Sequence, residues 1–126
     1  MFSKRSGLVR TRPAAIPYAA LANHILGVDY DLSLVFVGDK RTRTLNRQYR
    51  GKDKPTNVLS FPLEHESGEI FLNPRRIMLE ARSQGKPYAN YTAYLFIHGL
   101  LHLKGLRHGN IMEAREAAYM RDYRSM

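Results

Sequence analysis

Short apolar runs alternate with longer helical patterns along this chain, and this alternation is the strongest constraint on its fold. Three runs are rich in β-branched and aromatic residues, with turn-forming residues beside them: Leu32–Val37, Asn57–Pro62 and Glu69–Leu72. Pro62 confines the second run to a strand end or a sheet edge, because proline has no N–H to donate to a neighbouring strand. The alternation predicts one domain that combines strands with helices.

Helices are expected in the segments around these runs. They cover Ala14–Leu26, Asp39–Tyr49, Arg75–Gln84, Asn90–Lys104 and a last segment that begins at Asn110. Asp39 is placed to cap the second helix, and Asn73 followed by Pro74 is the expected start of the third. Asn110 and Glu113 have the spacing of a capping box. The apolar residues of the last helix share one face, at Met112, Tyr119, Met120 and Tyr123.

Composition excludes several classes of protein. The 126 residues include 20 Lys and Arg against 11 Asp and Glu, a formal charge of +9, and 44% are hydrophobic. A chain of this size buries about two-thirds of its unfolded surface, so we expect a packed core rather than disorder. The lack of cysteine excludes a disulfide scaffold, a cysteine-ligated zinc finger and a cysteine nucleophile. Any metal would have to be held by histidine and carboxylate.

The sequence favours a cytoplasmic protein with no membrane partner. No apolar run approaches the roughly 18 residues that a membrane helix needs. The basic start and the Ala20–Ala22 segment resemble parts of a secretion signal, but Pro13 and Pro17 interrupt the stretch between them. The residues after Ala22 continue a helical pattern, so we interpret this segment as part of the domain.

Three of the five histidines lie within eleven residues, in the pattern His98-x3-His102-x2-Gly105-x2-His108. On a helix, His98 and His102 would project from one face, close enough to bind one ion. Gly105 can end that helix in a left-handed conformation, which lets His108 return to the same ion from a loop. Three imidazoles leave one tetrahedral position open, as in catalytic zinc sites. Nickel, copper and iron are alternatives, because imidazole also suits them.

The same histidine spacing occurs in metzincin peptidases, which raises a different function. In those enzymes a glutamate directly after the first histidine takes a proton from the zinc-bound water. That position is Gly99 in this chain. Peptide hydrolysis by this mechanism is therefore disfavoured, and the sequence identifies no other general base.

Positive charge is concentrated between residues 40 and 54, where only Asp39 and Asp53 oppose it locally. The cations are Lys40, Arg41, Arg43, Arg47, Arg50, Lys52 and Lys54. Such a group favours a polyanion, because Lys and Arg neutralise phosphates without selecting a sequence. Arg50 stands where the helix meets the following turn, so its guanidinium could hold a phosphate beside the metal.

Polar and aromatic residues near this segment are secondary candidates for nucleic-acid binding. Asn57 and Ser60 could donate or accept hydrogen bonds, although polar residues on strands are commonly just exposed. Tyr49, Phe61 and Phe71 could stack on bases. We expect these three aromatics in the core, because strand aromatics usually pack inward.

Three segments together resemble the YbeY family of endoribonucleases: Leu45–Pro62, Gly68–Ile70 and His98–His108. That family comprises single-strand-specific, metal-dependent enzymes of ribosomal RNA maturation, including processing of the 16S 3′ end, and of ribosome quality control. The resemblance implies a small α+β domain over residues 1–126, with a mixed sheet of about four strands packed against helices. The fourth strand would have to come from Gly7–Arg12.

The resemblance also implies the roles of individual residues. His98, His102 and His108 look like ligands of one Zn²⁺ per chain and, with Arg50, like the catalytic residues. Single-stranded RNA, ribosomal RNA and a ribosomal protein or the ribosome would be the partners. Arg107 departs from the family pattern, which commonly has an acidic residue before the third histidine. Its replacement either alters the metal or adds a phosphate contact.

A function from another class stays open at this point. The chain could be a ribosome-assembly factor that binds RNA without cutting it and uses the metal only to stabilise its fold. The two functions differ in what His102→Ala does. A structural metal predicts that the variant unfolds, whereas a catalytic metal predicts lost activity in a folded protein.

Overall fold

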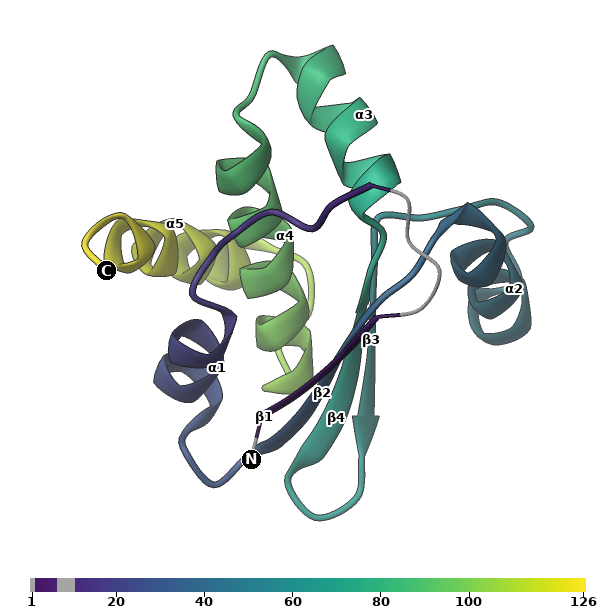
Figure 1. Cartoon of the computed structure of the whole chain (residues 1–126). Helices are drawn as coiled ribbons and strands as arrows, with labels where there is room; N and C mark the ends of the chain where they lie inside the picture. The colour runs from purple at the N-terminus through teal and green to yellow at the C-terminus, as the bar shows by residue number, and fades with distance from the viewer. Residues whose placement is uncertain (1, 7–10) are drawn as a thin grey trace.

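The computed structural model describes the backbone of residues 2–6 and all of residues 11–126, and it shows a mixed sheet with helices on both faces (Figure 1). The elements are β1 (Phe2–Ser6), α1 (Tyr18–Leu26), β2 (Asp31–Phe36), α2 (Asp39–Arg50), β3 (Val58–Leu63), β4 (Ser67–Leu72), α3 (Pro74–Gln84), α4 (Tyr88–Leu103) and α5 (Asn110–Arg124). Among the described helices, none has the length and apolar content needed to cross a bilayer. The predicted combination of helices with a mixed sheet is confirmed.

The sheet has the order β1-β2-β4-β3. β2 runs parallel to β1 and to β4, whereas β3 pairs antiparallel with β4 and forms an edge. Of these four strands, the side chains of β2, β3 and β4 are described. β1 adds backbone pairing at Phe2–Ser6, before the expected segment. Residues 7–10 of that segment lie outside the described residues, and Thr11 and Arg12 are not in a strand.

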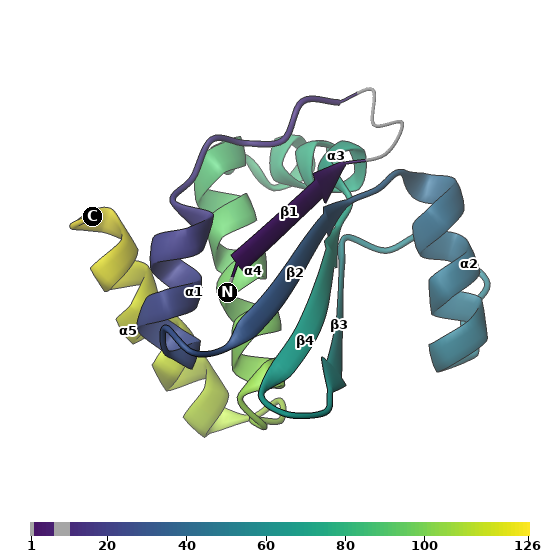
Figure 2. The same ribbon diagram turned by 60° about the horizontal axis from the view of Figure 1, so that its bottom comes forward.

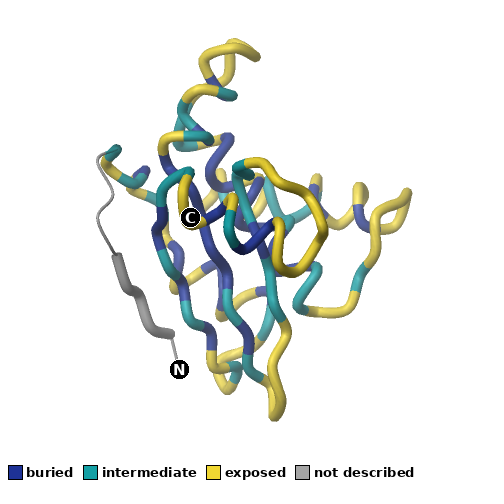
Figure 3. The backbone as a smooth tube through the Cα atoms, turned by 90° about the vertical axis from the view of Figure 1, so that its right-hand side faces the viewer, coloured by how far each residue is buried: buried dark blue, intermediate teal, exposed yellow. Residues whose placement is uncertain are grey.

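The two faces of the sheet carry different cores. On one face, α1 and α4 pack against alternate buried residues of β2 and β4, such as Leu34 and Ile70. On the other, α2 covers a smaller cluster in which Leu45 contacts side chains from the strands, including Leu59 and Phe71. Figure 2 shows α2 on the opposite side of the sheet from α1, α4 and α5. Buried and partly exposed residues alternate along β2, because the face packed by α1 and α4 has a larger core than the face packed by α2 (Figure 3).

Helix α4 lies close to the sheet at Gly99. A Cβ at this position would lie 2.8 Å from Ser60 Oγ on β3 and 3.3 Å from Ile70 Cδ1 on β4. The Ser60 hydroxyl donates to the Gly99 carbonyl at 3.1 Å. Position 99, where a peptidase would have its glutamate, is therefore filled by the contact between helix and sheet.

Helices α1 and α2 start differently from the sequence predictions. Helix α1 begins at Tyr18 rather than at Ala14, because Pro13 and Pro17 disfavour helix before that point. Gly38, not Asp39, is at the N-cap of α2, and the Asp39 carboxylate accepts hydrogen bonds from Asn73 and Arg76 instead.

The starts of α3 and α5 test two cap predictions. The Asn73 side chain accepts from the Arg76 N–H at 3.2 Å, with Pro74 as the first helical residue, so this cap is confirmed. The capping box at Asn110 is wrong, since Gly109 occupies the N-cap and its carbonyl accepts from the Glu113 N–H. The apolar face of α5 is confirmed, because Met112 is buried and Tyr119, Met120 and Tyr123 pack against the core.

Candidate functional site

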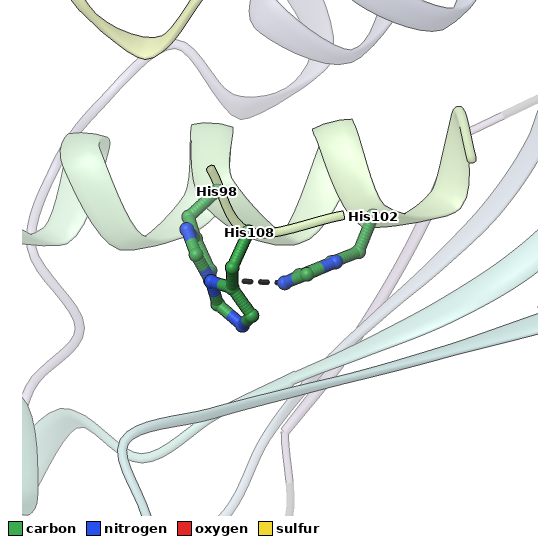
Figure 4. Close-up of side chains that lie close together, drawn as sticks. All are labelled: His98, His102 and His108. Carbon is green, nitrogen blue, oxygen red and sulfur yellow. Dashed lines mark hydrogen bonds between the residues drawn. The ribbon is translucent and has the colours of Figure 1, made fainter. Parts of the chain in front are cut away.

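The three clustered histidines meet at the C-terminal end of α4. His98 and His102 lie on successive turns of the helix, and His108 lies in the loop that leads to α5 (Figure 4). The loop turns at Gly105, which has a φ of 99° that only glycine adopts easily. One ligand nitrogen from each histidine lies within 4.8 Å of the others. The structure therefore brings together the three residues that the spacing predicted to converge.

The hydrogen bonds of these rings leave nitrogens suited to a metal. His98 Nδ1 lies 2.5 Å from Glu116 Oε2, and His102 Nδ1 lies 3.1 Å from the Leu106 carbonyl oxygen. Both Nδ1 atoms face acceptors, so the proton of each neutral ring belongs on Nδ1 and a lone pair remains on Nε2.

The two Nε2 atoms face each other at 3.0 Å. Two lone pairs at that distance repel each other unless a positive charge lies between them. Two nitrogens on one tetrahedral zinc ion stand about 3.3 Å apart for zinc–nitrogen bonds of about 2.0 Å. The donor set of His98, His102 and His108 thus fits a divalent transition metal.

His102 is held in the form that binds metal. Burial lowers the pKa of its imidazole below the usual value, and the nearby His98 and His108 rings lower it further. This shift favours the neutral ring, whose lone pair is available to an ion.

Glu116 belongs to this site, although the sequence analysis did not single it out. It lies on α5 and is 5% exposed, and its carboxylate meets His98. The sequence could have pointed to Glu116, because it falls on the apolar helix face formed by Met112, Tyr119 and Tyr123. A carboxylate on an apolar helix face requires a partner, since burying an unpaired charge is costly.

A cavity of about 740 Å³ opens beside the histidines. Its lining comes from the end of α2, the segment that leads into and along β3, and α4 with the loop after it: Tyr49, Arg50, Thr56, Asn57, Val58, Leu59, Ser60, Phe61, Pro62, Tyr94, Leu95, His98, His102 and His108. Asn57 and Ser60 face this space but also have structural partners, in Glu80 and the Gly99 carbonyl. The cavity is large enough for a nucleotide-sized ligand.

The edge of β3 forms one wall of the cavity. The Asn73 N–H donates to the Asn57 carbonyl, so Asn57, Leu59 and Phe61 direct their backbone groups toward β4. By alternation, the N–H and C=O of Val58 and Ser60 point away from β4, on the side of the cavity. Pro62 also lies at a position whose backbone points away from β4, so its missing N–H removes no hydrogen bond from the sheet.

The predicted basic residues are not gathered at the cavity. Among these described cations, Arg50 lines it. Arg43 and Arg47 pair with Asp53 at 2.8 and 3.4 Å, which offsets part of their charge. The others are all exposed but lie elsewhere: Lys40, Arg41 and Lys54 line separate hollows beside α2, Lys52 is in the turn after α2, and Arg107 is in the loop before His108.

Two exposed tyrosines stand at the cavity. Tyr49 is 60% exposed and packs on Phe61 with ring centres 5.0 Å apart, so the expectation of a core position for Tyr49 was wrong. Phe61 is partly buried and Phe71 is buried, as predicted. Tyr94, which the sequence analysis did not single out, is 36% exposed, with its ring centre 6.4 Å from that of His98. The sequence could have pointed to Tyr94, because it lies one helical turn before His98.

Comparison with known proteins gives a consistent family. The family model described as Endoribonuclease YbeY matches residues 14–125. The Endoribonuclease YbeY of Chromohalobacter salexigens is 44% identical over 105 residues, which cover 78% of this chain and 68% of that protein. That of Chelativorans sp. is 40% identical over 94 residues, covering 68% of this chain and 58% of the relative. The Neisseria gonorrhoeae protein of the same name is 38% identical over 120 residues, covering 82% and 69%.

The fold also matches a solved structure. The solution structure of TM1509 from Thermotoga maritima superposes with a TM-score of 0.67 at 24% identity, over 99% of this chain and 93% of that one. This likeness shows the shared fold, whereas the family model and the relatives carry the assignment. With its histidine cluster on α4 and the loop after it, this chain belongs to the YbeY endoribonuclease family.

Proposed function

We propose that this protein is a metal-dependent endoribonuclease that cleaves single-stranded RNA in the cleft between α4 and β3. The observation that carries the proposal is the convergence of three histidine nitrogens, within 4.8 Å of one another, at the wall of a cavity that Arg50 also lines. The names of the relatives and the family model support the endoribonuclease activity. The choice of zinc over nickel, copper or iron rests on the three-imidazole donor set.

The side chains around the cavity suit an RNA phosphodiester. When bound, a divalent ion would lower the pKa of a water molecule and withdraw charge from a phosphate oxygen. Arg50 carries a planar guanidinium at the cavity and can bind a phosphate through two N–H groups, which holds the scissile bond beside the histidines. His98, His102 and His108 would hold the ion, and burial lowers the pKa of His102, which favours its neutral, metal-binding form.

The cavity walls favour an unpaired strand. Tyr49 and Tyr94 present exposed ring surface, and a base can stack there only when it has left a duplex. The outward N–H and C=O groups of Val58 and Ser60 can bond to base edges. Phosphate contacts from Arg50 would add affinity without reading sequence.

We further propose the biological setting that the family resemblance implied. The substrate is ribosomal RNA, including the 3′ end of 16S RNA, and the partners are the ribosome or a ribosomal protein in the cytoplasm. A chain with a formal charge of +9 is suited to an RNA-rich particle. Lys40, Arg41, Arg43, Arg47, Lys52, Lys54 and Arg107 are proposed to contact RNA outside the cavity.

The test is cleavage of a 5′-labelled single-stranded ribosomal RNA fragment by the wild type and by His102→Ala, purified identically. Circular dichroism establishes that the variant is folded. Cleavage by the wild type alone supports the enzyme, since a contaminating ribonuclease would accompany both preparations. Equal cleavage by both, or RNA binding without cleavage by either, would contradict the nuclease and favour the non-catalytic assembly factor.

A second arm separates two chemical routes. A substrate with a single 2′-deoxy substitution at the cleaved position is cut only if water is the nucleophile. An internal attack by the 2′-hydroxyl leaves a cyclic phosphate and stops at the deoxy substrate. The end groups of the products distinguish these routes directly.

A further inference from the structure

We propose that Glu116 is a positioning residue for the metal: its carboxylate holds His98 in the tautomer and orientation that direct Nε2 at the ion. This inference rests on the metal site of the proposed function. It concerns a residue on α5, which supplies none of the three histidines.

The contact between Glu116 and His98 has the geometry of such a role. Glu116 Oε2 lies 2.5 Å from His98 Nδ1, and the side chains are 6% and 19% exposed. Because Nδ1 donates to the carboxylate, the Nε2 lone pair is left to face His102 Nε2 at 3.0 Å. A charged acceptor also makes the imidazole a stronger donor to a metal.

A purely structural role does not account well for the buried position of Glu116. The residue interrupts the apolar face of α5, between Met112 and Tyr119, where a leucine would pack without a buried charge. Burial of a carboxylate costs free energy unless a hydrogen-bond donor pairs with it. For Glu116 that donor is His98 Nδ1.

The second helical ligand provides an internal contrast. His102 Nδ1 meets the backbone carbonyl of Leu106, which belongs to the turn after α4. No side-chain substitution removes that acceptor. His98, in contrast, is oriented by a side chain of another helix. Its orientation can therefore be changed by a substitution at Glu116, which leaves all three histidines in place.

The experiment measures zinc affinity by competition with a chromophoric chelator, so it does not depend on RNA cleavage. The variants are Glu116→Leu, which removes the acceptor, and Glu116→Gln, which keeps an oxygen but loses the charge. Glu113→Gln is the matched control, because Glu113 is exposed and lies one turn earlier on the same helix. Urea unfolding of the metal-free proteins establishes that each variant is folded.

We expect Glu116→Leu to lose roughly 10- to 100-fold in zinc affinity, the range for removing such a partner. Glu116→Gln should lose less, and Glu113→Gln should match the wild type. The ¹⁵N shifts of the His98 ring in metal-free protein should show the proton on Nδ1 in the wild type and a mixture of tautomers in Glu116→Leu. A purely structural link between α4 and α5 would not predict the change of tautomer.

Wild-type zinc affinity and an unchanged tautomer in folded Glu116→Leu would overturn the proposal. If Glu116→Leu does not fold, Glu116→Gln decides: unchanged affinity and tautomer overturn the proposal, and a loss supports it. If the wild type itself binds no zinc, the metal site of the proposed function fails and this inference fails with it. If the wild type binds zinc and the Glu116 variants do so equally, only the role of Glu116 is lost.

Discussion

The Ser60 hydroxyl on β3 donates a hydrogen bond to the Gly99 carbonyl on α4, across 3.1 Å. This bond joins the edge strand to the helix between the turns that carry His98 and His102. Helix α4 and strand β3 form the two walls of the cavity, and they meet at Gly99, which has no side chain. The width of the cleft depends on one glycine.

We predict that Gly99→Ala destabilises the protein by about 1 to 3 kcal/mol, because the new Cβ would overpack the contact. That Cβ would stand 2.8 Å from Ser60 Oγ. The double variant Gly99→Ala/Ser60→Ala should lose less than the sum of the two single changes, since the second change removes the clashing atom. Urea unfolding of all four proteins measures this coupling. Strict additivity would show that α4 shifts without resistance from Ser60.

We predict that zinc raises the thermal stability of the protein and that a chelator reverses the effect. Free metal at 100 times its dissociation constant adds about 2.7 kcal/mol if it binds only the folded state. The measurement is the unfolding temperature with zinc and with excess chelator. His102→Ala should have an unfolding temperature that zinc does not change. An equal zinc effect on both proteins would place the ion elsewhere.

We predict that Arg50→Ala lowers kcat/KM for RNA by at least about tenfold, the effect of losing a phosphate contact worth about 1.4 kcal/mol or more. The slope of log affinity against log salt should fall by about 0.7, the value for one phosphate on a single strand. Arg115→Ala is the control, because Arg115 is an exposed cation on α5 that does not line the cavity and is not proposed to contact RNA. Equal losses in the two variants would indicate a diffuse field rather than a contact at Arg50.

We predict that Tyr49→Ala weakens RNA binding by about 1 to 3 kcal/mol, the range for one stacked base. Tyr49→Phe should retain most of the affinity, since it keeps the ring. The measurement is RNA affinity with the metal removed, so that cleavage does not interfere. Because Tyr49 is 60% exposed, neither change should alter the unfolding temperature strongly. Weak binding by Tyr49→Phe would point to the hydroxyl instead of the ring.

We predict a loss of stability above pH 10 that depends on Tyr18. Burial raises the pKa of its phenol, with smaller contributions from Tyr88 and Tyr123, and the hydroxyl donates to the Ala14 carbonyl. Tyrosine in the unfolded chain ionises near pH 10, while the folded state keeps the proton, so alkali favours unfolding. Tyr18 stabilises the fold fully below pH 10, and the stabilisation falls as the pH rises further.

The measurement compares the wild type with Tyr18→Phe by urea unfolding at pH 8 and pH 11. The advantage of the wild type should shrink by about 1.4 kcal/mol between these values, since the unfolded phenol ionises over one pH unit. The other tyrosines are common to both proteins and cancel in the difference. An unchanged advantage would mean that Tyr18 ionises as easily in the folded state.

Local patterns predicted the parts of the site that a single helix and its turn determine. The spacing of His98 and His102 and the glycine at position 105 contain the whole geometry of the cluster, because helix periodicity and one left-handed residue generate it. The strand predicted at Asn57–Pro62 was equally local, and it is found at Val58–Leu63. Pro62 limited it to a strand end or a sheet edge, and it lies at an edge. The Asn73 cap followed from two adjacent residues.

Features that depend on packing between distant segments were not accessible in this way. Asp39 was expected to cap its own helix, but its carboxylate accepts hydrogen bonds from Asn73 and Arg76 instead, which lie more than thirty residues later in the chain. The basic residues of α2 looked like one surface, yet a helix distributes them around its axis and Asp53 pairs with two of them. Glu116 has meaning only once α5 lies against α4.

The open edge of β3 has a consequence for self-association. None of the described strands pairs with the outer side of β3, so the N–H and C=O groups of Val58 and Ser60 there form a template. A strand of another copy could add to it, which is the usual route to aggregation of exposed sheet edges. Pro62 interrupts this template, because it offers no N–H at the next outward position. Val58 and Ser60 can therefore pair with a short ligand, whereas a continuous ladder of hydrogen bonds with a second protein molecule would be interrupted at Pro62.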